Sequence, residues 1–488
     1  MVVATETFTP ENLQDIQGFG IAGFNKDWQE SIFIKLPSAT VGKEFLAWLQ
    51  PQVANAWEVG TFNELFAEIR ERTGREPLRA TWTAVMISAA GYVALGVTTD
   101  DLPAGQSATA FNAGMAARSA QIGDTQQAGD APSGWLAPFQ QSADQVHVAV
   151  VVAADDESDL DQQVVEITEK AVDLGCEVVF VELGRTLPPP LTGHEHFGFK
   201  DGISQPSITG YGNPAQSDEP PTVSPGAFIF GYPDQSGSVV PVGPNWTDGS
   251  FVVFRRLTQD VAGFRNLAAA GVPEASPAPT AAEMGAKLIG RWPSGAPIEL
   301  FPHGDPGPGN EGSWNDFLFD ANEDTNGATC PVWAHIRKAN PRDEVPAGGP
   351  DDPLGHRMIR RGIPFGPPLP VGVLQDDGIA RGLHFFSVVA DLDQQFEFVQ
   401  LNWMNNSSFP TGTPPPSPGP YAPTPGVPAT GPDPVVGEYP TDTACIFQEA
   451  SGTQTFNLNS DLVTVTAGEY FFLPGLAALA AVSGASAG

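Results

Sequence analysis

The sequence is poor in cysteine. Its 488 residues include three, Cys176, Cys330 and Cys445, which lie far apart and form no Cys-x-x-Cys pair. An odd number of widely separated thiols argues against a disulfide framework and against a structural zinc site.

Basic residues are also scarce. The chain has 23 Lys and Arg against 57 Asp and Glu, which gives a formal net charge of −34 at pH 7. A chain this acidic repels the phosphates of nucleic acids and the headgroups of anionic lipids. We therefore expect neither nucleic acid nor a membrane surface as a partner.

Long hydrophobic runs are absent as well. The first 20 residues have no basic start and no apolar run, so they do not resemble a Sec-type signal. The most apolar stretch, 470–488, is interrupted by Pro474 and Gly475 and falls short of the ~20 residues that span a bilayer. These features favour a soluble, cytoplasmic protein, although the acidity would also suit export by another route. The sequence gives no oligomeric state.

The chain does contain enough apolar material for a substantial core. Hydrophobic residues make up 41% of it, with 30 Phe and 10 Trp, which argues against a disordered or fibrous protein. The length suits one large domain or two ordinary ones. The 53 Gly and 48 Pro predict many loops between elements.

Hydrophobic periodicity predicts alternating strands and helices. In the first half, strands are expected at 32–36, 146–152 and 178–181 and helices at 62–69 and 157–174, while 82–87 fits a strand or the start of a buried helix. In the second half, strands are expected at 227–230, 251–254, 383–389 and 469–472, and helices at 257–270 and 391–403.

This order predicts an α+β fold of two ferredoxin-like modules, each an antiparallel sheet with helices packed on it. We place the modules at residues 1–225 and 226–488. The proline-rich stretch 410–440 has too many prolines for regular structure and is interpreted as a surface insertion.

Two histidine contexts leave alternatives open. His194 and His196 form a His-x-His pair before Asp201, which suits a metal ligand pair or a polar loop beside a tight turn. His335 has three basic residues within the next seven positions. It could be a ligand with cations that hold an anionic group, or the end of a helix whose bases match its dipole.

Two further segments each have a functional and a purely structural interpretation. Residues 320–327 begin like a calcium loop, but the sixth position is Thr325 and the twelfth is Pro331, where such a loop needs Gly and Glu, so we expect a solvated turn. Arg360 and Arg361 precede Gly362 beside an apolar run. They suit either a cation placed in a pocket or a surface turn.

Four segments of the chain, in their order and spacing, form a specific pattern. Gly-Phe-Lys-Asp-Gly stands at 198–202, Ala-His-Ile-Arg-Lys-Ala-Asn-Pro-Arg at 334–342, Arg-Arg-Gly-Ile-Pro-Phe-Gly at 360–366 and Leu-His-Phe at 383–385. This order and spacing resemble the dye-decolorizing peroxidases, a family of haem enzymes. The resemblance covers roughly residues 145–405, and the chain length resembles the longer bacterial and fungal branch. It implies a haem b cofactor in a pocket mainly within the C-terminal half.

The resemblance implies roles for individual residues. His335 would be the proximal ligand, binding the haem iron through Nε2, and Asp391, or else Asp393, would hold its other ring nitrogen. An aspartate before an apolar helix can equally be an N-cap, so Asp391 has both interpretations.

On the distal face, Asp201 would take a proton from the peroxide and return it to the departing oxygen. Because a carboxylate accepts a proton at lower pH than an imidazole does, activity should persist into acid. Arg360, rather than Arg361, would stabilise the negative charge that develops there. The other implied residues are Gly198 and Gly202 for close backbone approach, Leu383 and Phe385 for the pocket wall, and Arg337, Arg342 and, less clearly, His356 for the haem propionates.

The implied activity is oxidation of dyes, phenols or other bulky reductants by hydrogen peroxide through an oxoferryl intermediate. A surface Trp or Tyr would relay electrons, and the sequence does not say which. An alternative is a protein that stores haem or removes its iron. Outside haem chemistry, an acidic metal or carbohydrate binder using the two His-rich and Asp-rich loops remains open.

Overall fold

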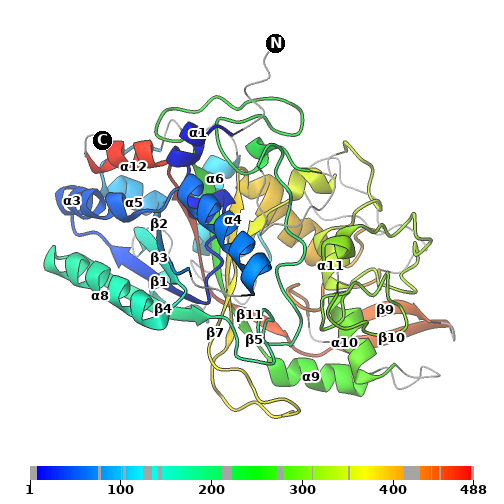
Figure 1. The fold of residues 1–488 in the computed structure, drawn as a ribbon. Helices are drawn as coiled ribbons and strands as arrows, with labels where there is room; N and C mark the ends of the chain where they lie inside the picture. The colour runs from blue at the N-terminus through cyan, green and yellow to red at the C-terminus, as the bar shows by residue number, and fades with distance from the viewer. Residues whose placement is uncertain are drawn as a thin grey trace.

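The structure is a computed structural model. It describes residues 8–74, 78–99, 102, 106–124, 134–140, 146–211, 222–271, 279–309, 311–349, 352–410, 429–440, 442–449 and 452–484. Figure 1 shows sheet strands from both ends of the chain side by side, with helices around them.

One antiparallel sheet organises the described residues. Its nine strands are β1 (Trp28–Lys35), β2 (Thr81–Ser88), β3 (Val148–Ala154), β4 (Glu177–Arg185), β5 (Ser250–Gln259), β6 (Ile359–Arg360), β7 (Ile363–Phe365), β8 (Gly382–Val389) and β11 (Val463–Leu473). Their order is β5-β11-β2-β3-β1-β4-β7-β8-β6, and an additional pairing of β5 with β8 closes the sheet into a barrel. β9 (Thr443–Glu449) and β10 (Gly452–Leu458) form a separate hairpin.

The strand order confirms the α+β, ferredoxin-like prediction. In the first half the order is β2-β3-β1-β4, so the first strand lies between the third and the last, as in a β-α-β-β-α-β unit. The second half repeats this pattern, because β5 lies between β11 and β8, and β8 pairs with the short β6 and β7. The boundary between 1–225 and 226–488 stays a prediction.

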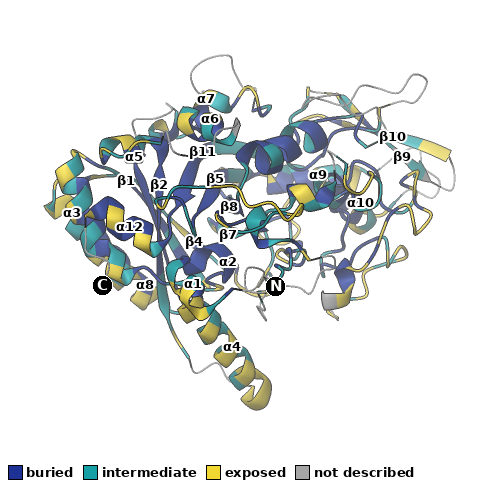
Figure 2. Ribbon diagram, turned by 90° about the horizontal axis from the view of Figure 1, so that it is seen from above, coloured by how far each residue is buried: buried dark blue, intermediate teal, exposed yellow. Residues whose placement is uncertain are grey.

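Helices cover the outside of the barrel. The α-helices are α1 (Pro10–Asp15), α2 (Gly18–Ile21), α3 (Ala39–Leu49), α4 (Ala56–Thr73), α5 (Ala89–Ala94), α6 (Gln106–Ala113), α7 (Met115–Arg118), α8 (Glu157–Asp173), α9 (Val261–Ala270), α10 (Ala281–Ile289), α11 (His335–Ala339) and α12 (Leu476–Ser483). The 3-10 helices are η1 (Gln50–Gln52), η2 (Ala137–Phe139), η3 (Pro225–Ala227), η4 (Glu311–Asn315) and η5 (Pro353–His356), and η6 (Leu392–Glu397) and η7 (Val399–Met404) are π-helices. Figure 2 shows that α4 is largely exposed along its length.

The two halves share one core. Phe33 of β1 packs against Phe254 of β5, with 4.8 Å between ring centroids, and against Phe471 of β11 at 6.2 Å. All three rings are fully buried. A barrel whose interior is filled from both halves cannot lose one half without exposing the apolar face of the other.

Most predicted elements are confirmed, and 82–87 forms a strand. The strand predicted at 227–230 is wrong, because Phe228 and Ile229 donate their backbone N–H groups to Pro225 in a tight turn. The helix predicted from 257 begins later: β5 continues to Gln259, and Asp260 caps α9. A helix-like spacing in that segment was outweighed by pairing with β8 and β11.

The proline-rich stretch divides in two. Residues 411–428 lie outside the described residues, so the insertion is not tested there. Residues 431–435 are buried, which makes the surface prediction wrong for that part. Within the described ranges, no helix has both the length and the apolar character needed to cross a membrane.

Candidate functional site

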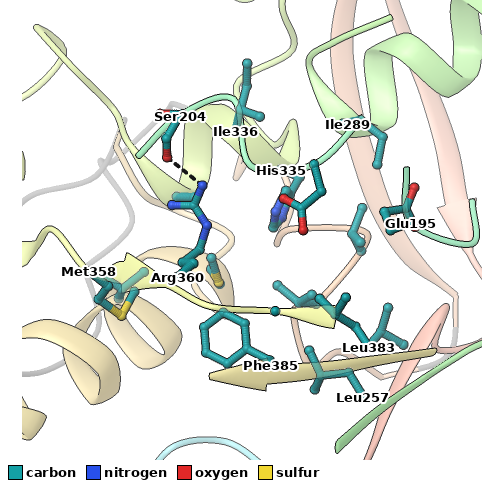
Figure 3. Close-up of a pocket in the computed structure, with 18 of the residues that line it drawn as sticks. Glu195, Ser204, Leu257, Ile289, His335, Ile336, Met358, Arg360, Leu383 and Phe385 are labelled. Carbon is teal, nitrogen blue, oxygen red and sulfur yellow. Dashed lines mark hydrogen bonds between the residues drawn. The ribbon is translucent and has the colours of Figure 1, made fainter. Parts of the chain in front are cut away.

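A cavity of about 280 Å³ lies beside the β5–β8 pair. Its walls come from the loop 195–204, from β5 and β8, from α11, from the segment 356–362, from the two π-helices and from residues 435–438. Figure 3 shows labelled side chains from the loop 195–204, β5, β8, α11 and the segment 356–362 around the cavity. The sequence motifs that lie far apart in the chain therefore meet in one place.

The sheet supplies an apolar wall. Leu257 on β5 lies opposite Leu383 on β8, and Arg255 lies opposite Phe385. Because side chains alternate between the two faces of a strand, these four residues share one face, and all four line the cavity. Leu383 and Phe385 are thus in the pocket wall, as the resemblance implied.

His335 begins α11 and faces the cavity with its imidazole. Its Nδ1 lies 2.7 Å from Oδ2 of Asp433, whose side chain is fully buried. The other oxygen of Asp433 accepts the backbone N–H of Val435 at 2.7 Å. Burial lowers the pKa of His335, but the neighbouring Asp433 charge outweighs this effect and the net shift is upward.

This pair fixes the tautomer of the imidazole. A carboxylate beside Nδ1 holds the ring proton there, which leaves the lone pair of Nε2 for a metal ion. Within the described part of the chain, no hydrogen-bond partner occupies Nε2. The ring is therefore held in the form that ligates iron.

The carboxylate on His335 is not the one the sequence suggested. Asp391 caps η6 by accepting the Gln394 N–H at 3.0 Å and the Ser107 hydroxyl at 2.5 Å. Asp393, the second candidate, pairs with Arg118 at 3.0 Å. Asp433 was missed because it stands in the proline-rich stretch, where no local pattern marks a buried carboxylate.

Asp201 and Gly202 stand on a turn that opens into the same cavity. Oδ1 of Asp201 accepts the Gly202 N–H at 2.6 Å, and the Asp201 N–H donates to Gly193 at 3.1 Å. Gly202 has φ +79°, a conformation that strains other residues. Both residues are exposed to the cavity side, so the Asp201 carboxyl is open to a ligand.

The two adjacent arginines point to different places. Arg360 lines the cavity, and its Nη2 donates to the backbone carbonyl of Ser204 (Figure 3). Its own backbone is held by Gln205 through two hydrogen bonds. Arg361 instead donates to the carbonyls of Phe19 and Ile21 at the end of α2, so it ties the halves together.

Of the two arginines predicted near the haem propionates, only Arg342 lies at the cavity. Arg342 lines the cavity and donates Nη1 to Asn315 at 2.8 Å. Arg337 does not reach it, which corrects the prediction: its side chain is fully buried and paired with Asp324 at 2.9 Å and Glu344 at 2.6 Å. His335, Ile336 and Ala339 of α11 line the cavity, whereas Arg337 and Lys338 lie on the other side of the helix and are fully buried.

Sequence reasoning gave no role to the other charged residues of the cavity, although Lys200 lies within the motif at 198–202. They are Glu195, Lys200, Arg255, Arg291, Arg357 and Glu438. Alternation along β5 from Leu257 would have found Arg255, since both lie on one face. His356, the less clear propionate candidate, also lines the cavity, with its ring stacked on Phe398 at 4.0 Å between centroids.

The competing metal interpretations gain no support. One ring nitrogen of His194 bonds the Thr192 carbonyl, and one of His196 bonds the Phe365 carbonyl, so each ring already has a protein partner. Asp324, in the calcium-like loop, accepts the backbone N–H groups of Thr329 and Cys330. The described residues contain no group of three or more His, Cys, Asp or Glu side chains placed to hold a metal ion.

The donor set fits a haem better than a bare ion. One imidazole with a free Nε2 is too few ligands for a protein-bound ion, but it is the usual axial ligand of a haem iron. The cavity adds apolar walls for a porphyrin, and its arginines suit carboxylate side groups. The residues of this cavity in the α+β barrel therefore fit a haem.

Comparison with known proteins identifies the family. A family model described as the DyP dimeric alpha+beta barrel domain matches residues 15–181. Peroxidase 2 of Mycetinis scorodonius is 31% identical over 96% of this chain and 87% of its own length, and a dye-decolorizing peroxidase of Auricularia auricula-judae is 30% identical over the same shares. A solved ancestral D-type dye-decolorizing peroxidase superposes with a TM-score of 0.82 at 29% identity, covering 97% of this chain and 99% of that one. The chain belongs to the dye-decolorizing peroxidases, which are haem-dependent enzymes.

Proposed function

We propose that this protein binds haem b through Nε2 of His335 and uses hydrogen peroxide to oxidise phenols, dyes and other bulky aromatic reductants. The observation that carries the proposal is the cavity itself, where the His335–Asp433 pair, Asp201 and Arg360 meet. Storage or sensing of haem needs the histidine but not the other two side chains. Having all of them in one cavity supports a peroxidase.

On the proximal side the chain sets the basicity of the ligand. Asp433 holds the proton on Nδ1 of His335, so the Nε2 lone pair is directed to the cavity and made more electron-rich. When bound, the haem supplies a redox-active iron at which peroxide is reduced. The surrounding apolar side chains exclude bulk water, which strengthens the charge interactions inside the cavity.

On the distal side the chain moves a proton. Oδ1 of Asp201 is held by the Gly202 N–H, so Oδ2 is the atom free to take a proton from one peroxide oxygen and give it to the other. Arg360 places a guanidinium beside the negative charge that develops on the departing oxygen. The Ser204 carbonyl fixes the orientation of that guanidinium.

The relatives support the choice of reductant. One solved relative, 30% identical and matching 96% of this chain with a TM-score of 0.77, is a complex with 2,6-dimethoxyphenol. A methoxyphenol gives up one electron and one proton readily and suits a cavity with apolar walls. We extend this substrate class to the present chain, with 2,6-dimethoxyphenol as the reporter reductant.

The test combines spectra with three variants. The purified holoprotein should show a Soret band that shifts on hydrogen peroxide and returns on adding 2,6-dimethoxyphenol. His335→Ala should lose the Soret band, whereas Asp201→Asn and Arg360→Leu should keep it and lose about 100-fold or more in the rate with peroxide. Asp391→Asn, which changes a helix cap and a hydrogen bond to Ser107 outside the cavity lining, should react at the wild-type rate.

Two outcomes would contradict the proposal. A Soret band that does not respond to peroxide, or iron-free porphyrin as the product, would support haem storage or iron removal. No band after haem is supplied would rule out a haem protein.

A further inference from the structure

The loop that carries Asp201 is built around a second carboxylate, that of Glu195. Oε2 of Glu195 accepts the backbone N–H of Phe197 at 2.8 Å, and Oε1 accepts that of Phe199 at 2.9 Å. The Gln259 amide donates to Oε2 at 2.5 Å. Three donors therefore converge on one side chain, and both oxygens act only as acceptors.

The backbone closes around this carboxylate. The Glu195 N–H donates to the Phe199 carbonyl at 3.0 Å, and the Gly198 N–H donates to the Glu195 carbonyl at 2.9 Å. Residues 195–199 thus form a closed turn whose inward N–H groups end on Oε1 and Oε2. An ionised carboxylate can satisfy this arrangement, whereas an amide would set its own N–H₂ against a backbone N–H.

The turn is rigidly connected to Asp201. Lys200 donates its N–H to the Pro293 carbonyl at 3.1 Å, and Asp201 donates its N–H to Gly193 at 3.1 Å. The second bond joins the two ends of the segment 193–201, which contains Glu195, and the first fixes the segment to Pro293. A displacement of the Phe199 backbone should therefore also displace Asp201, which lies two residues along the chain.

Glu195 is held by the sheet on its other side. Gln259 is the last residue of β5, and its backbone N–H donates to the Arg381 carbonyl at 2.9 Å. The carboxylate therefore links the distal loop to the strand that also carries Leu257 and Arg255 of the cavity wall. Glu195 itself lines the cavity, as Figure 3 shows.

Retaining a carboxylate here is costly. No cation pairs with Glu195 in the described part of the chain. Burial, with a smaller effect from Asp201, raises the pKa of Glu195 to about 7. A buried charge without a counter-ion is destabilising, and only its hydrogen bonds offset that cost here. Two of the three hydrogen bonds of Glu195 go to the backbone of the loop that carries Asp201, and the third goes to Gln259 of β5.

We propose that Glu195 is a positioning residue that holds the Asp201 loop against the end of β5 and so sets where the Asp201 carboxyl lies in the cavity. The inference rests on the proposed peroxidase function. It assigns Glu195 no contact with peroxide or haem. Its effect on the reaction is carried entirely by Asp201.

The experiment is a double-mutant cycle on the haem-loaded protein. Glu195→Gln alone should lower the second-order rate constant with hydrogen peroxide by about tenfold or more, with the Soret band retained. In an Asp201→Asn background the same change should alter the rate less than twofold, because the group it positions is already gone. Glu195→Asp, which keeps two acceptor oxygens, should restore part of the rate.

A second readout is independent of activity. Hydrogen exchange of the backbone amides in 196–202 should rise at least tenfold in Glu195→Gln, while amides of β3 on the far side of the barrel stay unchanged. Glu177→Gln, an exposed change at the start of β4, is the matched control and should alter neither readout.

The outcomes separate this inference from the proposed function. If the wild type neither binds haem nor reacts with peroxide, the proposed function fails. If the wild type reacts and Asp201→Asn is slow, but Glu195→Gln keeps the wild-type rate and exchange, only the inference on Glu195 is overturned. Equal effects of Glu195→Gln in both backgrounds would also overturn it, because they would indicate a general loosening of the cavity.

Discussion

Asp433 and Asp391 are both aspartates whose side chains accept a backbone N–H group, yet their neighbours give them different roles. Asp433 is fully buried and lies 2.7 Å from Nδ1 of His335. Asp391 accepts the Gln394 N–H at the start of a helix. The residue type and the local sequence do not distinguish the two, whereas the imidazole beside Asp433 does.

We therefore expect opposite results from two matched variants. Asp433→Asn should lower haem affinity or the peroxide rate by about 10- to 100-fold, because the imidazole loses the partner that fixes its tautomer. Asp391→Asn should leave both unchanged, since asparagine also caps helices. Haem titration followed by Soret absorbance measures the first quantity. A normal titration for Asp433→Asn would show that the pair does not govern ligation.

Among the secondary-structure elements, the π-helices that form one cavity wall are held in place by a buried ion-pair cluster. Nε of Arg118, at the end of α7, donates to Glu397 at 2.7 Å, and its Nη2 pairs with Asp393 at 3.0 Å. Tyr470 on β11 donates its hydroxyl to Glu397 at 2.7 Å. Because η6 and η7 carry Phe396, Val399, Gln400 and Met404 of the cavity, the cluster supports the site from outside.

Arg118→Leu should destabilise the protein by about 3–5 kcal/mol, because it leaves two carboxylates buried without their cation. Urea denaturation followed by far-UV circular dichroism measures the change. Arg72→Leu, which breaks an exposed pair with Glu68 on α4, is the control and should leave the midpoint unchanged. A midpoint for Arg118→Leu equal to that of the wild type would show that the cluster contributes nothing net.

At the scale of the whole molecule, the acidic composition has a consequence for pH dependence. Burial raises the pKa values of Glu469 and Glu438 to about 7. Each of these groups binds a proton in the folded state at pH values where it is ionised in the unfolded chain. The stability that these protonated groups contribute is therefore fully present below the unfolded pKa of ~4.3. It is lost as pH rises through the folded pKa of about 7.

The free energy of unfolding should accordingly fall between pH 5 and pH 7, by about 1.4 kcal/mol per pH unit for each such group. Glu182 does not oppose this trend in that window. Burial raises its pKa, but His384 and Arg256 more than offset this and lower it to about 2. Urea unfolding at pH 5, 6 and 7 measures the slope, and Glu469→Gln should flatten it. A wild-type stability that rises over this range would contradict the assignment.

The sequence by itself determined the parts that depend on local pattern. Hydrophobic periodicity predicted the strand at 383–389 and the helix α8 with its buried face, and the family resemblance implied Leu383 and Phe385 in the pocket wall. The family motifs placed His335, Asp201 and Arg360, and the structure brings all three into one cavity. These successes share a cause, because each depends on residues close together in the chain.

Which distant groups meet depends on the packing of the whole chain. It paired His335 with Asp433 across 98 positions and turned Arg337 away from the cavity into an ion-pair cluster. It also made one barrel from strands of both halves through the β11–β2 and β4–β7 pairings. Burial and long-range contact are properties of the packed chain, and no local periodicity encodes which buried carboxylate will reach which imidazole.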